Sequence, residues 1–316
     1  MNSRSTHIRL AAVSVALAFA AGGLQAKTFK WTSASDIPTW DIHSQNNALA
    51  NGIHAAVYES LVYYNSKTFK PEPVLATAWK QMTPTQLRLN LRTGVKFHDG
   101  STFSADDAVF SIERAMAKTS NFGIYAQGID KVVKVDANTI DIFTKDPNPV
   151  LLNQLTELRM MSKAWAEKNN STAPKDIKTQ DENFAHRNAN GTGPFVLKEW
   201  QPDQKMVLTR NPAWWGKAEG NVTEVVYTPV KAVATRMAAL LSGEVDLVLD
   251  PSPQDLPRLR QDPKLKVIDG IENRTIFFGM DQHRDELPGS NVKGKNPLKD
   301  VRVRKALYQA IDMNSI

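Results

Sequence analysis

The sequence predicts a mixed α/β fold in two parts, with a change of character near Asn190. Before this point, strict apolar–polar alternation in residues 86–92 and a turn between two strand-like runs at 132–143 indicate antiparallel strands. After it, strand and helix patterns alternate, which is typical of parallel strands joined by crossover helices in an open sheet. A chain of 316 residues is long enough for two domains.

The first 26 residues have the layout of a secretory signal peptide. Arg4 and Arg9 form a basic start, residues 10–21 carry no charge, and small residues precede a plausible cleavage site after Ala26. The uncharged run is too short for a membrane anchor, since a spanning helix needs about 20 apolar residues. We therefore expect residues 1–26 to be removed and the remaining 290 to be exported to a bacterial periplasm.

The composition excludes several classes of protein. The chain has no cysteine, so neither a disulfide framework nor lipidation on an N-terminal cysteine is expected. Without Arg4 and Arg9 the net charge falls from +6 to +4, and the basic residues form no dense block. Nucleic-acid binding normally requires a basic stripe, and we expect none here.

The periodicity places each element in order along the chain. The last predicted helix is capped by Asp300. Its residues Val303, Leu307 and Ile311 share an apolar face that no later element covers. We therefore expect the sequence to be truncated. The predicted strands are 86–92, 132–135, 139–143, 195–200, 206–209, 222–229, 245–249 and 265–268, and the predicted helices are 105–118, 150–158, 231–243 (closed by Gly243) and 253–261.

The stretch KFHDGSTFSADDAVFSIERA (96–115) has the residue types of a hydrolase site, but a turn and a helix start explain it better. Asp99-Gly100 is a turn pair, and Ser104 stands three residues before Asp107, which is the signature of a helix start. Nucleophile, base and acid must converge in space, and neighbours within one turn seldom do. An exported hydrolase using His98 or Asp99 is kept as the alternative.

Other catalytic patterns are absent from the sequence. It contains no H-E-x-x-H, no G-x-S-x-G, no Walker loop and no G-x-G-x-x-G. We expect no catalytic residues, no metal and no cofactor. The Gly191-Thr192-Gly193-Pro194 stretch is read as a crossover turn between domains rather than a phosphate-binding loop.

Several blocks together resemble one known family. They are VYESLVYYNSKTFKPEPVLATAW, KFHDGSTFSADDAVFSIERA, GTGPFVLKEWQPDQKMVLTRNPAWWG, LLSGEVDLV and PLKDVRVRKALYQAIDMNSI. In this order they are similar to the extracytoplasmic solute-binding proteins of ABC transporters, in the dipeptide, oligopeptide and nickel family (family 5). The resemblance runs from about residue 31 to the end of the sequence.

The resemblance implies a type II periplasmic-binding-protein fold with two lobes and an inserted α/β domain. Residues 27–55 and 186–275 would form the first lobe, 56–185 the inserted domain, and 276–316 the start of an incomplete second lobe. It also implies the function: a periplasmic substrate-binding component that captures a peptide or similar small solute between the lobes. The implied partners are that solute and ABC permease subunits, for a monomeric protein. A non-transport peptide-binding or sensor role on the same fold is a further alternative.

The resemblance also suggests residues that line the cleft. Arg159 falls where some members place a basic residue facing a ligand carboxylate, although a solvated residue after a helix end is an equal alternative. Tyr125 falls where some members place an aromatic residue in the cleft, and a packing role is the stronger alternative. Trp214 and Trp215 are interpreted as packing residues. The complete set of predicted ligand-binding residues is Ser35, Asp36, Asn46, Asn47, Tyr125 and Arg159.

Overall fold

The computed structural model describes residues 27–270 and 277–315, except positions 180 and 314. The predicted signal peptide lies outside the described residues. The chain forms two compact units, one up to Asp255 and one from Leu256 onward. None of the helices within the described ranges is long and apolar enough to cross a membrane.

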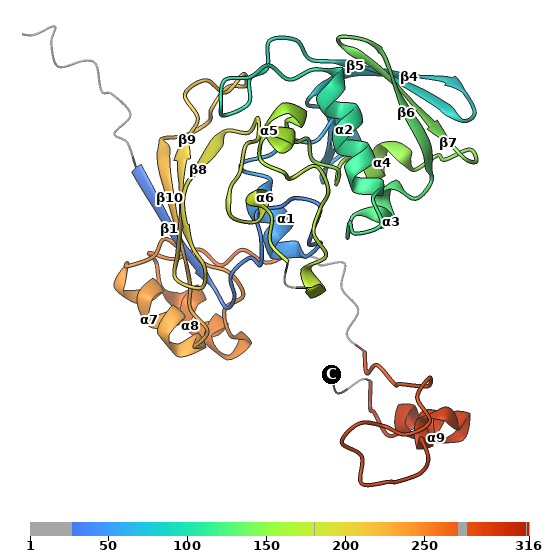
Figure 1. The fold of residues 1–316 in the computed structure, drawn as a ribbon. Helices are drawn as coiled ribbons and strands as arrows, with labels where there is room; N and C mark the ends of the chain where they lie inside the picture. Colours follow the sequence, from blue (N-terminus) through green and yellow to red (C-terminus); the bar gives the residue numbers. More distant parts are fainter. Residues whose placement is uncertain (1–26, 180, 271–276, 314, 316) are drawn as a thin grey trace, which may run out of the picture. The chain divides into compact units, whose positions relative to one another are not determined.

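The first sheet has the strand order β11-β1-β10-β9-β8 (Figure 1). Strand β1 lies between β11 and β10 and runs parallel to both, whereas β9 and β8 continue the sheet antiparallel. The predicted parallel pairing with crossovers is therefore confirmed for three of the five strands. The bounds are β1 Lys27–Ser33, β8 Phe195–Gln201, β9 Lys205–Arg210, β10 Val222–Pro229 and β11 Leu247–Val248.

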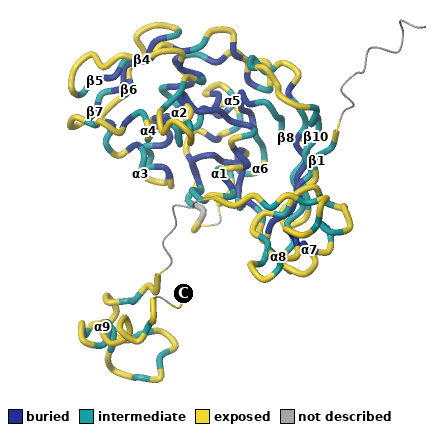
Figure 2. Tube along the Cα trace, turned by 180° about the vertical axis from the view of Figure 1, so that it is seen from behind, coloured by how far each residue is buried: buried dark blue, intermediate teal, exposed yellow. Residues whose placement is uncertain are grey.

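The second sheet is fully antiparallel, in the order β4-β5-β7-β6, as the alternation and the turn at 136–138 predict. One face of the sheet packs against α2, whose buried side chains include Ala108, Ile112 and Ala115. Figure 2 shows buried positions along α2 and along strands of this sheet. The bounds are β4 Ala76–Thr83, β5 Gln86–Leu91, β6 Ile129–Asp136, β7 Thr139–Thr144 and α2 Ala105–Met116, and a separate hairpin pairs β2 Val62–Asn65 with β3 Lys70–Pro73.

Shorter helices fill the rest of this unit. The helix predicted at 150–158 ends early, at Leu155, because Arg159 forms a strand-like bridge to Ser60 and the Met160 amide donates to the Glu59 carbonyl at 2.8 Å. Tertiary pairing overrides the helical pattern here. The helices are α1 Ala48–His54, α3 Gly123–Ala126, α4 Leu151–Leu155, α5 Lys163–Lys168, α6 Phe184–Arg187 and α7 Val233–Ser242, with 3-10 turns at Ile177–Thr179 and Pro253–Asp255.

The second unit contains α8 Leu256–Gln261, a 3-10 turn at Pro297–Lys299 and α9 Val301–Gln309. The Asp300 carboxylate caps α9 by accepting from the Arg302 amide, as predicted, and α9 has no buried residue. The strand predicted at 265–268 is wrong. This segment has no neighbouring strand to pair with, and Ile268 is 79% exposed. The predicted division at 56, 186 and 276 stays a prediction.

Two predicted glycine positions are explained by the backbone. Gly243 ends α7 in the left-handed conformation, with φ of 78°. A Cβ on Gly191 would lie 2.0 Å from the Val57 carbonyl oxygen, and one on Gly193 would lie 2.8 Å from that of Ala56. The Gly191–Gly193 segment is therefore glycine-rich because it crosses directly over another stretch of backbone.

Candidate functional site

The predicted residues Asn46 and Asn47 lie at the start of α1. The Asn47 side chain caps this helix, with Oδ1 accepting from the Ala50 amide at 2.8 Å. Oδ1 of Asn46 accepts from Nδ2 of Asn51 at 2.9 Å. Both side chains thus hold the entry to α1 in place, and a cap of this kind stabilises a helix by about 1 kcal/mol.

Arg159 lies beside α1 and has no acidic partner. Its Nη2 donates to the backbone carbonyl of Asn51 at 3.1 Å, and its backbone bridges to Ser60. Burial lowers the pKa of the guanidinium, although the nearby charge of Glu157 opposes this shift. Within the described parts of the chain no carboxylate forms an ion pair with Arg159. A half-buried guanidinium with no carboxylate paired to it among the described residues is suited to an external anion, above all a planar carboxylate.

Two histidines near Arg159 are neutral at ordinary pH. Burial lowers the pKa of His43 to about 3, and the charge of Arg114 adds to the effect. Burial likewise lowers the pKa of His54 to about 4, and the positive charge of Arg159 contributes. Neither imidazole therefore adds positive charge at neutral pH. The positive charge beside these histidines is that of the Arg159 guanidinium.

The segment from Trp40 to Asn51 also carries buried polar atoms without hydrogen-bond partners. The described residues contain six such side-chain atoms, and four of them fall in this segment. Buried polar groups are nearly always paired in folded proteins, so these atoms are available to bound water or to another molecule. The four atoms are Trp40 Nε1, His43 Nε2, Ser44 Oγ and Asn51 Oδ1.

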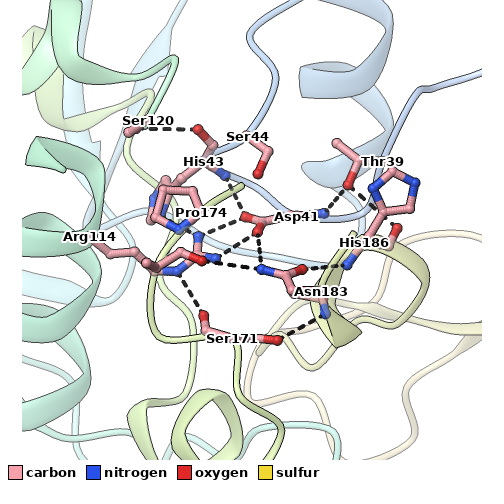
Figure 3. A network of polar contacts seen from close by, with 12 residues as sticks. Thr39, Asp41, His43, Ser44, Arg114, Ser120, Ser171, Pro174, Asn183 and His186 are labelled. Carbon is pink, nitrogen blue, oxygen red and sulfur yellow. Dashed lines mark hydrogen bonds and ion pairs between the residues drawn. The ribbon is translucent and has the colours of Figure 1, made fainter. Parts of the chain in front are cut away.

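A buried ion pair between Asp41 and Arg114 anchors this segment (Figure 3). Arg114 Nη1 and Nη2 donate to Asp41 Oδ1 and Oδ2 at 2.7 and 2.6 Å. Burial alone would raise the pKa of Asp41, but the charge and hydrogen bonds of Arg114 hold it at about 2. Asn183 Nδ2 also donates to Asp41, and Arg114 Nε donates to the Ser171 carbonyl at 3.1 Å. The network joins three segments that are distant in sequence.

Arg114 also sets the tautomer of His43. Its Nη1 lies 3.2 Å from His43 Nδ1. Because a guanidinium can only donate, Nδ1 must accept and the ring proton sits on Nε2. The sequence pattern did not identify Asp41 and Arg114 as structural partners. The available signal was the position of Arg114 on the buried face of α2, with Asp107 and Ser111.

Ser35 and Asp36, predicted to line the cleft, follow β1 and hold the sheet together. Asp36 Oδ2 accepts from Trp200 Nε1 at 2.9 Å and from the Asp203 amide at 2.8 Å, so this carboxylate anchors the β8–β9 turn. The Ser35 carbonyl accepts from the hydroxyls of Ser33 and Tyr227. Among the described residues no hydrogen bond or ion pair links these two residues to Arg159.

Tyr125 lies on α3, partly buried against the core of the second sheet. Its ring centroid is 5.9 Å from that of Phe122, which in turn meets the His43 ring edge to face at 5.8 Å. Among the described residues, Phe122 therefore links Tyr125 to His43. The geometry suits packing, and ligand contact by Tyr125 stays a prediction.

The His98–Asp99 turn is tied to the backbone of the crossover segment. His98 Nδ1 accepts from the Gly191 amide at 3.3 Å, and Nε2 donates to the Gly193 carbonyl at 3.1 Å. Asp99 accepts from Ser101 and Asn190. Gly100 adopts φ of 87°, and Ser104 and Asp107 form the predicted capping box. The predicted turn and helix start are thus confirmed.

Trp214 and Trp215 pack as predicted and share one acceptor. Their indole N–H groups donate to the Glu59 carboxylate at 3.1 and 2.9 Å, and Arg92 stacks over Trp215 at 3.9 Å. Burial raises the pKa of Glu59, although these hydrogen bonds oppose the shift. In the described chain, no three His, Asp or Glu side chains group in a way that could hold a metal ion.

Comparison with known proteins places this chain in a family. The model for bacterial extracellular solute-binding proteins, family 5 (middle part), matches residues 70–316. The chain belongs to this family. The family resemblance seen in the sequence is thus confirmed, and the relatives named below are binding proteins rather than enzymes.

Individual relatives agree with the family. Heme-binding protein A of Haemophilus influenzae is 28% identical over 84% of this chain and 49% of its own length. The dipeptide-binding protein of Escherichia coli is 26% identical over 82% and 49%. The chain therefore spans about half the length of the curated relatives it matches.

A solved structure supports the predicted type of fold. The periplasmic binding protein DppA of Helicobacter pylori, in complex with the peptide STSA, superposes with a TM-score of 0.65 at 26% identity. The match covers 75% of this chain and 49% of that one. The two-lobed α/β class is confirmed for the part of the fold that this chain contains.

Proposed function

We propose that this chain is part of the periplasmic substrate-binding component of an ABC importer, exported by a signal peptide at residues 1–26. It captures a peptide or similar small solute between two lobes and delivers it to permease subunits in the inner membrane. It acts as a monomer and catalyses no reaction. Closure of the lobes around the solute is a hinge motion in which no bond is made or broken.

The observation that carries this proposal is the unpaired guanidinium of Arg159. An arginine presents two parallel N–H groups that match the two oxygens of a carboxylate. The neighbouring His43 and His54 are neutral, so the positive charge here is that of the Arg159 guanidinium. A monoanionic group, such as the carboxyl terminus of a peptide, neutralises it. The peptide bound to the H. pylori relative is of this chemical class.

The test compares peptides with and without the carboxylate. Binding of trialanine and of its C-terminal amide to the complete protein is measured by calorimetry, with Arg159→Gln and with Arg210→Gln as the control. Arg210 is a fitting control because its Nη2 likewise donates to a backbone carbonyl, that of Gly220. We expect the amide to bind at least tenfold more weakly than the acid, and Arg159→Gln to remove this preference.

Two results would contradict the proposal. Equal affinity for acid and amide in the unaltered protein would remove Arg159 as the carboxylate anchor. Failure to bind any member of a panel of peptides, opines, glutathione and metal chelates would remove the solute-binding role itself. Hydrolysis of a peptide or ester that is lost in Asp99→Asn would instead support the alternative of an exported hydrolase.

A further inference from the structure

The β2–β3 hairpin, which belongs to neither larger sheet, carries exposed aromatic side chains. Tyr63, Tyr64 and Phe69 are 55%, 37% and 71% exposed. The rings of Tyr64 and Phe69 meet edge to face, with centroids 6.4 Å apart. Tyr64 lies opposite Pro71 on the paired strand, so Tyr64, Pro71 and Phe69 form an apolar face of the hairpin, while Tyr63 points to the other face.

Phe69 occupies a backbone conformation that normally suits glycine. Its φ is 57°, in the left-handed region, which a bulky side chain rarely adopts. The turn is held firmly, because the Phe69 amide donates to the Asn65 carbonyl at 2.7 Å and Asn65 Oδ1 accepts from the amides of Lys67 and Thr68. A mostly exposed phenyl ring contributes little to the core. Strained backbone conformations of this kind cluster at functional sites.

The tip is also positively charged. Lys67 and Lys70 are exposed, and within the described ranges neither forms an ion pair. The acidic residue of the hairpin, Glu72, accepts a hydrogen bond from Asn65 Nδ2 at 2.6 Å and is partly buried. Two free lysines beside exposed aromatic rings are complementary to a surface that is anionic outside and apolar beneath.

A lipid bilayer fits this chemistry better than a protein surface. A specific protein interface buries about 800 Å² on each partner, and three side chains at a hairpin tip are far too few for that. Aromatic side chains concentrate at the headgroup level of membranes, and lysines are drawn to anionic lipids. We propose that the β2–β3 tip inserts Phe69 into the headgroup region of an anionic bilayer, with Lys67 and Lys70 against the lipid phosphates.

The test is co-sedimentation of the full chain with vesicles of phosphatidylglycerol and phosphatidylethanolamine, and with vesicles of phosphatidylcholine alone. Phe69→Gly removes the ring and relieves the backbone, so we expect partition to fall about tenfold while the melting temperature stays equal or rises. The double change Lys67→Gln and Lys70→Gln lowers partition about tenfold and weakens its dependence on salt.

The matched control is Phe184→Ala, because Phe184 is an exposed phenylalanine on α6, 46% accessible. It should bind vesicles as the unaltered chain does. The proposal is overturned if the unaltered chain does not bind anionic vesicles, or binds phosphatidylcholine equally well. It is also overturned if Phe69→Gly binds as tightly as Phe69, or if that variant melts at a lower temperature. Loss of solute uptake by Phe69→Gly with vesicle binding unchanged would assign the tip to a protein partner instead.

Discussion

Asp41 and Arg114 show how strongly one buried pair can constrain a chain. Their side chains are 1% and 0% exposed. Removing two charges from water costs several kcal/mol for each, and only paired geometry with further hydrogen bonds offsets that cost. The two parallel bonds between the side chains, together with those from Asn183 and to Ser171, provide such a geometry.

Breaking this pair should be far more damaging than breaking an exposed one. Asp41→Ala leaves the Arg114 charge buried without a partner, and we expect the free energy of unfolding to fall by about 3–5 kcal/mol. Lys134→Ala removes an exposed pair with Asp106 and should cost less than about 1 kcal/mol. Urea unfolding of both variants checks this. Similar losses for the two would mean that Asp41 is not a critical contact.

At the same scale, the sequence identified Arg159 but not its surroundings. A family resemblance pointed to the residue, whereas its lack of a counter-ion depends on which carboxylates the fold brings near. Asn46, Asn47 and Asp36 were predicted to bind ligand, and the structure gives each of them a hydrogen bond within the protein. Side-chain type alone does not distinguish a cap from a ligand contact.

Among the elements, β5, β6 and β7 followed the sequence pattern, whereas the strand predicted at 265–268 is absent and the helix predicted at 150–158 ends early. The alternation at 86–92 and the turn at 136–138 predicted β5, β6 and β7 because period-two patterns and turn residues are local signals. The early end of α4 depends on pairing between Arg159 and Ser60, which are 99 residues apart and leave no local trace.

The crossover segment gives a sharp test at the element scale. Gly191→Ala places a methyl group against the Val57 carbonyl, so we expect a loss of about 3 kcal/mol or more, or no soluble protein. Gly52→Ala, inside α1 with no atom within 4 Å of the new Cβ, should instead stabilise by up to about 1 kcal/mol. Thermal melts of both variants decide. A stable Gly191→Ala protein would show that the two backbone segments can separate.

For the molecule as a whole, buried histidines should make stability depend on pH. His43 and His54 stay neutral in the folded state down to pH values of about 3 and 4, while the unfolded chain takes up protons near pH 6.5. Burial also lowers the pKa of His98. The unfolded state therefore binds more protons below pH 6.5, and stability falls as pH falls towards 4, by up to about 1.4 kcal/mol per pH unit for each histidine.

Urea unfolding between pH 7 and pH 4 checks this expectation. His54→Asn should reduce the slope, and the exposed His283→Asn should leave it unchanged. Burial raises the pKa of Glu59 and Asp107, which acts in the opposite direction, whereas the lowered pKa of Asp41 adds to the slope near pH 4. A stability that stays level or rises on acidification would contradict the neutral burial of these histidines.

The sequence by itself determined the α/β class, most strands, the capped helices and the family, because these follow from local periodicity, turn chemistry and recognisable blocks. Only the tertiary structure decided that Arg114 is paired while Arg159 has no carboxylate partner among the described residues, that His98 binds backbone, and that Phe69 stands strained and exposed. Each of these depends on which distant segments meet. Contacts between distant segments determine which charges are compensated, which side chains are buried and which backbones approach each other. No local sequence pattern encodes these contacts.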